Sequence, residues 1–273
     1  MNARPHYIFI VIILVLVIWM LTKIQYTVKE TDTLPDEVAG ETGSVEGDTP
    51  VIKMKNVYVY PGIFEGAFQK GTQVIQDAQT YSFYTQTIGK ITIESGKLVA
   101  CDPIVLQDVE PYVYDFPKGK FPVQLGLVNY QEYPRVSFAR ILFSQKPVVT
   151  WRLALHGGQE PLEVGSENIY CFGVDAASGI FADYQTCKTF MKFHEDEWEE
   201  TFMGNTDFRT GFMREFDWGN FAIFSTGYGD GCYATYVGFD DQGEICRFLA
   251  DFATVSWWLL PNPRLQPSVA DTL

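Results

Sequence analysis

Four aspartates are the residues of this sequence with the clearest capacity for chemistry. They are Asp102, Asp175, Asp183 and Asp230. Glycines on both sides of Asp230 let its carboxylate approach a cation or ligand with little steric hindrance. Carboxylates that meet at loop tips could hold Mg²⁺ or Ca²⁺, or act as acid and base. The same sequences are also ordinary turns in which a carboxylate caps backbone N–H groups, and the sequence leaves both interpretations open.

Most other catalytic classes lack their signatures here. The chain has no Walker loop and no G-x-G-x-x-G, G-x-S-x-G or H-E-x-x-H motif. Of its 3 histidines, His6 belongs to the N-terminal apolar region, so only His156 and His194 remain for a triad or metal cage. We expect a surface or capping role for His156 and a solvated position for His194.

The 5 cysteines match no zinc pattern, because no C-x-x-C occurs. If the domain is exported, Cys171 and Cys187 are the pair that we would test first for a disulfide. The alternative is that all five are small buried apolar residues.

The net charge of the chain limits the classes of partner that it can attract. The chain has 34 acidic and 20 basic residues and a formal net charge of -14, which argues against non-specific binding to nucleic acid. A basic partner or a cation is the better electrostatic match, although acidic excess also serves solubility alone.

The N-terminal segment predicts a membrane anchor. Residues 7–21 are uncharged, and Lys23 is the only charge between residues 5 and 26. About 20 helical residues cover a bilayer core of about 30 Å, so we expect a single transmembrane helix at about 6–25 within an anchor at 1–28. A cleaved signal peptide is the main alternative, but no small-residue cleavage site follows. We expect a signal-anchor in the cell membrane with the N-terminus inside and the domain extracytoplasmic. The opposite topology stays open.

Three further regions follow the anchor. Residues 29–50 are rich in Asp and Glu among Thr, Gly and Pro, and predict an acidic flexible linker. Residues 51–260 predict one β-rich globular domain, because β-branched and aromatic runs alternate with turn residues. The tail at 261–273 contains three prolines and is expected to be loosely ordered.

Within the domain the patterns predict a mainly β (α+β) fold, either an antiparallel β-sandwich or a barrel-like meander with one or two short helices. Expected strands lie at 121–128, 135–144, 148–155, 220–226, 232–239 and 244–252. Residues 90–100 read as a hairpin that turns at Ser95 and Gly96. Helical spacing of aromatic residues predicts a helix at 189–203, and a shorter helix is expected at 62–70.

At the same aspartates the chain resembles a bacterial family known as domain of unknown function 4241, which has a Gly-Asp-Gly motif. The similar segments are GKLVACDP at 96–103, GKFPV at 119–123, Val174 and Asp175 with Gly179 and Asp183, and STGYGDGCY at 225–233 with Tyr236 and Gly238. The resemblance extends over about residues 51–255. The chain departs from the family pattern at residues 232–236, which read CYATY where we expect GYPVY. The N-terminal membrane anchor is not a general feature of the family. Because the family has no established activity, the resemblance implies a shared fold only.

Two functions fit these observations. The first is a membrane-tethered, non-enzymatic binding domain that meets a protein or other ligand through aromatic loops and an acidic surface. The second is a carboxylate-dependent hydrolase, in which Asp102, Asp175, Asp183 and Asp230 gather around a divalent cation or water. The two differ in one geometric requirement, which is convergence of the four carboxylates.

Overall fold

The computed structural model describes residues 50–54, 59–130, 133–204 and 210–260. The chain divides into two units at residues 1–45 and 46–273, and every described residue belongs to the second. The predicted transmembrane helix, nearly all of the predicted linker and the predicted tail lie outside the described residues. Within the described ranges, no helix is both long enough and apolar enough to cross a membrane.

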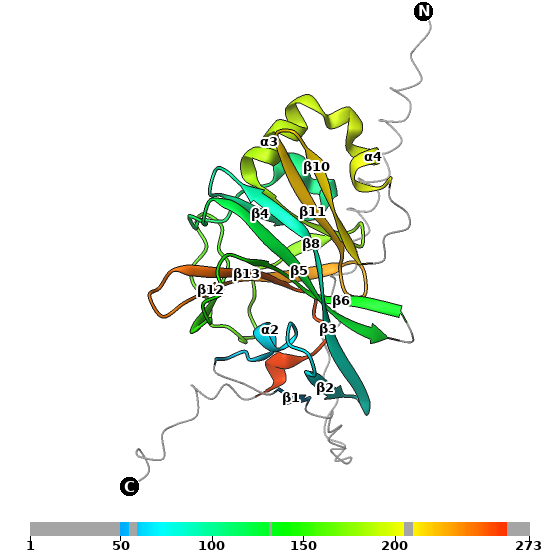
Figure 1. The fold of residues 1–273 in the computed structure, drawn as a ribbon, viewed down its shortest axis with the longest axis vertical. Coiled ribbons are helices and arrows are strands. Elements are labelled where there is room, and N and C mark those ends of the chain that lie inside the picture. The colour runs from blue at the N-terminus through cyan, green and yellow to red at the C-terminus, as the bar shows by residue number, and fades with distance from the viewer. Residues whose placement is uncertain (1–49, 55–58, 131–132, 205–209, 261–273) are drawn as a thin grey trace, which may run out of the picture. The chain divides into compact units, whose positions relative to one another are not determined.

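The larger of two antiparallel sheets has nine strands and curls into a half-barrel (Figure 1). Its order is β1 (Val51–Lys53), β2 (Gln73–Gln76), β3 (Gln79–Ile93), β5 (Gly119–Tyr130), β6 (Tyr133–Leu142), β13 (Ile245–Asp251), β12 (Gly231–Phe239) and β7 (Thr150–Leu153). The short strand β8 (Phe172–Val174) also pairs with β12. The six predicted strands correspond to β5, β6, β7, β11, β12 and β13.

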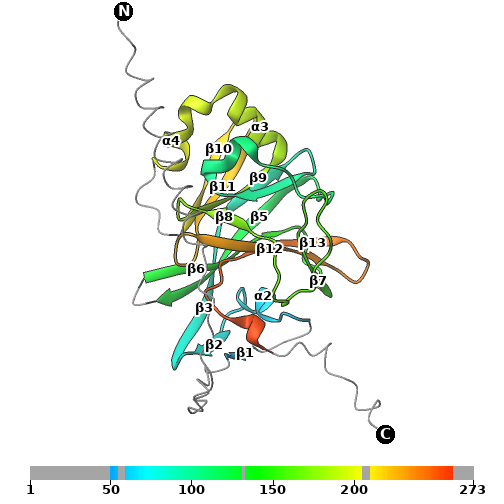
Figure 2. The ribbon, with the colours of Figure 1, turned by 180° about the vertical axis from the view of Figure 1, so that it is seen from behind.

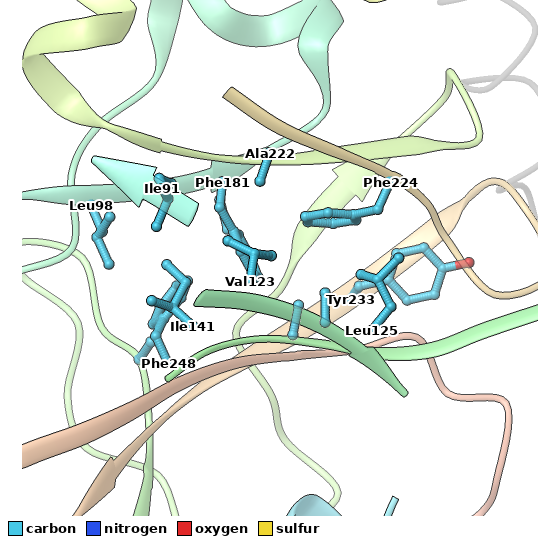
Figure 3. Close-up of a cluster of buried hydrophobic side chains, with 14 of the residues drawn as sticks. Ile91, Leu98, Val123, Leu125, Ile141, Phe181, Ala222, Phe224, Tyr233 and Phe248 are labelled. Atoms are coloured by element: carbon cyan, nitrogen blue, oxygen red, sulfur yellow. The ribbon is translucent and has the colours of Figure 1, made fainter. Parts of the chain in front are cut away.

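The smaller sheet has four strands and packs against one face of the larger. Its order is β10 (Gly211–Phe216), β11 (Gly219–Ser225), β9 (Ser178–Asp183) and β4 (Leu98–Cys101). Figure 3 shows the core between the sheets, where Phe181 from the smaller sheet packs against Phe224 of the same sheet and against Phe248 from the larger. Burial of each such ring contributes about 2 kcal/mol. The predicted mainly β class with a few short helices is confirmed, and the larger sheet is curled into a half-barrel.

Short helices cover the two outer faces. They are α2 (Ile63–Gly66), η1 (Pro103–Asp108), α3 (Tyr184–Phe193), η2 (Glu195–Glu197), α4 (Trp198–Phe202) and η3 (Trp257–Leu259). Figure 2 shows α3 and α4 beyond the smaller sheet, and Phe190 and Phe202 pack there against Phe221. On the outer face of the larger sheet, Phe64 from α2 packs against Trp257 from η3.

The predicted hairpin at 90–100 is wrong, because its two halves belong to different sheets. Ile93 pairs with Gly119 in the larger sheet, whereas Leu98 pairs with Asp183 in the smaller. Gly96 does turn the chain, with a φ of 79°. The backbone N–H groups of the turn are held by a distant carboxylate rather than by a facing strand, so the turn links the two sheets.

The predicted helix at 189–203 is also wrong as a single element. Its first part is α3, which begins earlier than predicted, and the helix ends at His194 with a φ of -135°. The His194 ring stacks on Trp218, with centroids 5.0 Å apart. The acids of η2 then begin a second helical segment, at the helix end where negative charge is favourable. The predicted helix at 62–70 is present as the shorter α2.

The predicted Cys171–Cys187 disulfide is wrong, because Cys171 is bonded to Cys232. Pairing of β8 with β12 brings these two residues together with their Cα atoms 5.4 Å apart, within the range that a disulfide needs. Cys187 lies instead on α3, where it is buried and free. Burial raises its pKa well above the usual value and keeps it a neutral thiol.

Candidate functional site

Asp102 is buried, and its carboxylate accepts hydrogen bonds from the backbone around it. Its Oδ1 accepts a hydrogen bond of 2.7 Å from the N–H of Ile104 and so caps η1. Its Oδ2 accepts bonds of 2.7 and 2.8 Å from the N–H groups of Asp175 and Ala176. The carboxylate therefore holds the turn between β8 and β9 against the start of η1.

The Gly-Asp-Gly loop meets the other side of that turn. Asp230 is exposed, and its Oδ1 accepts a 3.1 Å bond from the N–H of Ala177. The Tyr233 hydroxyl donates to the Gly229 carbonyl at 2.7 Å and closes the loop on itself. Asp102, Asp175 and Asp230 thus gather around one turn, where the carboxylates of Asp102 and Asp230 accept hydrogen bonds from the backbone.

Asp183 lies at the opposite end of β9 from this turn, about 16 Å away at about 3.3 Å per residue. It is buried and caps α3, accepting from the N–H of Gln185 at 2.8 Å. Its other oxygen accepts from the N–H groups of Glu94 and Ser95 and from the Ser95 hydroxyl. In the part of the chain that the structure describes, no three His, Cys, Asp or Glu residues are grouped to hold a metal ion. These contacts are those of turn-capping carboxylates.

A different part of the molecule has the shape of a ligand site. A pocket of about 540 Å³ opens on the outer face of β12, between the loop after β7 and the segment after β13. The loop contributes residues 165–167 and Ile169, β12 contributes Cys232, Ala234 and Tyr236, and the C-terminal segment contributes Asp251, Ala253, Trp257, Trp258 and Leu259. Such mostly apolar pockets with a few polar groups are the usual form of a binding site.

A smaller hollow of about 230 Å³ adjoins the first. It is lined by Tyr60, Glu163, Val164, Leu260 and the residues shared with the larger pocket, which are Gly165, Ser166 and Trp258. Because Trp258 lines both hollows, the two are lobes of one aromatic site. We call the two lobes together the tryptophan pocket.

Trp257 anchors the inner wall of the tryptophan pocket. Its ring lies edge-on to those of Phe64 and Tyr236, at centroid distances of 4.9 and 6.1 Å. Its indole N–H donates a 2.6 Å hydrogen bond to Oδ2 of Asp251, whose Oδ1 accepts from the N–H of Ala253 at 2.9 Å. This places a buried carboxylate at the base of an aromatic wall.

The ionisable groups of the pocket are perturbed by burial. Burial raises the pKa of Asp251 to about 6, against the lowering effects of the Trp257 and Ala253 hydrogen bonds. Burial and the charge of Asp251 raise the pKa of Tyr236 well above the usual value. Burial and the charge of Glu163 likewise raise the pKa of Tyr60. Ionisable groups with shifted pKa values are typical of functional sites, and they also occur in structural ion-pair networks.

Two features hold the loop wall in place. The Cys171–Cys232 disulfide ties the end of the loop to the strand that forms the pocket floor. At Gly165 the φ is 87°, and a Cβ there would lie 2.5 Å from the Tyr60 hydroxyl oxygen. Glycine therefore suits both the left-handed backbone and the close approach to Tyr60.

The rim of the pocket is apolar and exposed. Ile169 is 46% exposed, Trp258 is 40% exposed and Leu259 is 58% exposed. Single exposed apolar residues are ordinary on a protein surface, whereas here three lie around one pocket.

We expect the buried state of Asp251 to give the stability a specific pH dependence. Its pKa is raised from 3.8 to about 6 on folding, so between these pH values the folded protein binds more protons than the unfolded chain. Stability therefore falls as pH rises through this window. Relative to an Asp251→Asn variant, the wild type should lose about 2 kcal/mol of unfolding free energy between pH 4 and pH 7. Urea unfolding of both proteins measures this difference, and parallel pH profiles would contradict it.

The fold and this site define a two-sheet antiparallel β protein with one aromatic, acidic pocket. Residues 91–250 match the family described as protein of unknown function (DUF4241), and the chain belongs to that family. No curated protein and no solved structure matches the chain.

Sequence reasoning missed most of the pocket residues. Tyr236 was noted only as part of a motif, and Asp251, Trp257 and Trp258 were not considered. A tandem tryptophan shortly after a strand that ends in aspartate was the available signal. The region that matches the family model ends at residue 250, before Asp251, Trp257 and Trp258.

Proposed function

We propose that this protein is a membrane-tethered, non-enzymatic domain that binds a protein partner through the tryptophan pocket. The observation that carries the proposal is the combination of a pocket of about 540 Å³ with an exposed apolar rim. Binding hot spots cluster where large apolar and aromatic groups surround a well-packed depression. A partner side chain would enter the pocket while the rim covers its surroundings.

The exposed apolar rim favours a protein over a small molecule as the ligand of the pocket. A small molecule is largely buried by its pocket, and it would leave Trp258 and Leu259 facing water. A partner surface would cover both residues as well as Ile169. The partner would thereby remove the apolar groups from water and gain the contact area that a stable complex needs.

Non-enzymatic binding is proposed over hydrolysis because of how the aspartates are used. Asp102 and Asp183 are both buried and each accepts several hydrogen bonds from nearby backbone and side-chain donors. A carboxylate committed to such donors is poorly placed to exchange them for a metal ion. The hydrolase hypothesis also required all four carboxylates to converge, and Asp183 lies at the far end of β9.

The tether rests on the sequence of residues 6–25, which we propose as a single-pass signal-anchor in the cell membrane. The Cys171–Cys232 disulfide supports an extracytoplasmic location for the domain, because disulfides persist in oxidising compartments. The acidic linker would then hold the domain away from the membrane surface, with the tryptophan pocket available to partners outside the cytoplasm.

Site-specific cross-linking in intact cells tests this proposal on the full-length chain. A photo-reactive benzoylphenylalanine replaces Ile169 at the pocket rim, and the cross-linked protein is recovered from washed membranes. We expect a discrete adduct of higher mass, because the probe lies where the partner binds. Adding Trp258→Ala to the same protein should remove most of the adduct by removing a wall of the pocket.

The matched control places the same photo-reactive residue at Phe193, an exposed aromatic position at the end of α3. Absence of an adduct at position 169, or the same adducts from 169 and 193, would refute partner binding at the pocket. Recovery of the full-length chain in the soluble fraction would refute the tether independently.

A further inference from the structure

The charged residues of the tryptophan pocket all have one sign. Glu163 lines the smaller lobe, and Glu167 and Asp251 line the larger. Among the residues that the structure describes, the lining of the two lobes includes no Lys, Arg or His. An anionic group entering this site would meet three carboxylates with no basic side chain in the lining to balance them, so the local field favours a positive ligand.

The aromatic walls have the same preference. Tyr60, Tyr236, Trp257 and Trp258 line the two lobes. The faces of aromatic rings carry negative electrostatic potential, and tryptophan binds cations most strongly among them. Trp257 and Trp258 have ring centroids 6.0 Å apart at an interplanar angle of 82°. The two indoles therefore form a corner in the wall of the larger lobe, which both of them line.

We propose that the tryptophan pocket takes a cationic side chain, lysine or arginine, from the partner protein. This inference rests on the proposed function and adds the chemistry of the residue that is recognised. Both side chains combine an apolar stem with a charged head. The stem fits the apolar rim at Ile169 and Leu259, and the head fits the aromatic and acidic interior.

The whole-chain charge supports the same partner. A formal net charge of -14 attracts basic proteins and repels acidic ones. Long-range attraction alone would act at many places on the surface, whereas aromatic walls and carboxylates occur together in this pocket. The proposal therefore predicts that recognition depends on the pocket residues and not only on the total charge.

The test uses the full-length protein in lipid nanodiscs with 5-fluorotryptophan at its 6 tryptophan positions. A Trp258→Phe variant assigns the Trp258 resonance in the fluorine NMR spectrum. The probes are the N-acetyl methylamides of lysine, arginine and norleucine, of which norleucine is nearly the length of lysine but uncharged. We expect lysine and arginine to shift the Trp258 resonance with at least about fivefold higher affinity than norleucine.

Substitutions of single glutamates test whether the preference for a cationic probe arises in the pocket. Glu163→Gln and Glu167→Gln should each reduce the preference for lysine over norleucine by about twofold to threefold, because exposed charges act weakly. Glu199→Gln, at an exposed position on α4, should leave the preference unchanged. An equal effect of all three variants would mean that net charge, and not the pocket, attracts the cation.

The outcomes separate this inference from the function on which it rests. Norleucine binding as tightly as lysine would overturn the cationic inference and leave a pocket for apolar side chains. Failure of every probe to move the Trp258 resonance would also overturn it. In both cases the cross-linking result at position 169 decides independently whether the pocket binds a protein.

Discussion

Replacing Asp183 with alanine is expected to lower the free energy of unfolding by about 4 kcal/mol. Asp183 is 1% exposed, and its carboxylate accepts hydrogen bonds from three different residues. It caps α3 through the N–H of Gln185, and its second oxygen accepts from both donors of Ser95 and from the N–H of Glu94. Alanine leaves these partly buried donors without their acceptor, so each costs an amount toward the lower end of the about 1–3 kcal/mol of an unmet buried donor.

Pulse proteolysis of the full-length protein in urea measures this loss as a shift of the midpoint by roughly 1 to 2 M. Asp230→Ala is the matched control, because that carboxylate is exposed and accepts a hydrogen bond from the N–H of Ala177. We expect the control to change stability by less than about 1 kcal/mol. If Asp183→Ala were as stable as Asp230→Ala, the structural role of Asp183 would be wrong.

Asp183 also explains why the hairpin at 90–100 could not be predicted. The local pattern of two apolar runs around Ser95 and Gly96 is the pattern of a hairpin. What decides the structure is a carboxylate about 90 residues further along the chain, which takes the N–H groups of the turn. The second run then pairs with β9, the strand that carries this carboxylate. Sequence spacing contains no record of such a distant acceptor.

Strands were easier to predict where local chemistry and distant packing agree. Residues 232–239 and 244–252 are β-branched and aromatic, and the four residues between them suit a reversal. In the structure β12 and β13 pair directly around that reversal, where Asp240 accepts from the N–H groups of Gln242 and Glu244. Here the turn is stabilised by its own aspartate, so the pattern alone was sufficient.

The tryptophan pocket could not be predicted, because four separate segments of the chain form it. The loop wall is held by Cys171, whose partner Cys232 is 61 residues away. Sequence proximity instead favoured Cys187, which the structure places on α3. The Cys171–Cys232 pairing, together with the packing of Leu162, Val164 and Tyr170 against the cluster that contains Trp257, brings the loop at 163–169 to the tryptophans of η3. The aspartate site failed for a different reason. Asp-Pro and Gly-Asp-Gly are turn sequences, and from sequence alone they cannot be distinguished from carboxylates that bind a cation.

A buried charge cluster provides the second large test. Glu65 on α2 lies between two arginines of the larger sheet, with its Oε1 accepting from Arg140 and from Arg247 at 3.0 Å each. Oε2 accepts a further bond of 3.2 Å from Arg247. The Arg140 guanidinium also lies over the Phe68 ring, 3.8 Å from its centroid. Burial lowers the pKa of Arg140 to about 10, and the Arg247 charge acts in the same direction.

Glu65→Gln should therefore destabilise the domain by about 3 kcal/mol, at the lower end of the range for breaking a buried ion pair. Glutamine keeps one acceptor but turns an N–H₂ group toward the guanidinium of Arg247. The two arginines then repel each other without a carboxylate between them. The Glu65 side chain is 23% exposed, so water reaches the site and the loss stays below the upper end of that range.

The same substitution at a pocket residue is the control, because Glu163 is exposed and lines the smaller lobe. Glu163→Gln should change the urea midpoint by no more than about 0.3 M. A wild-type midpoint for Glu65→Gln would show that the arginines find other acceptors. Because α2 also carries Phe64 against Trp257, loosening of Glu65 should reach the pocket wall. The Glu65→Gln protein should then show a broadened Trp257 fluorine resonance, whereas Glu163→Gln should not.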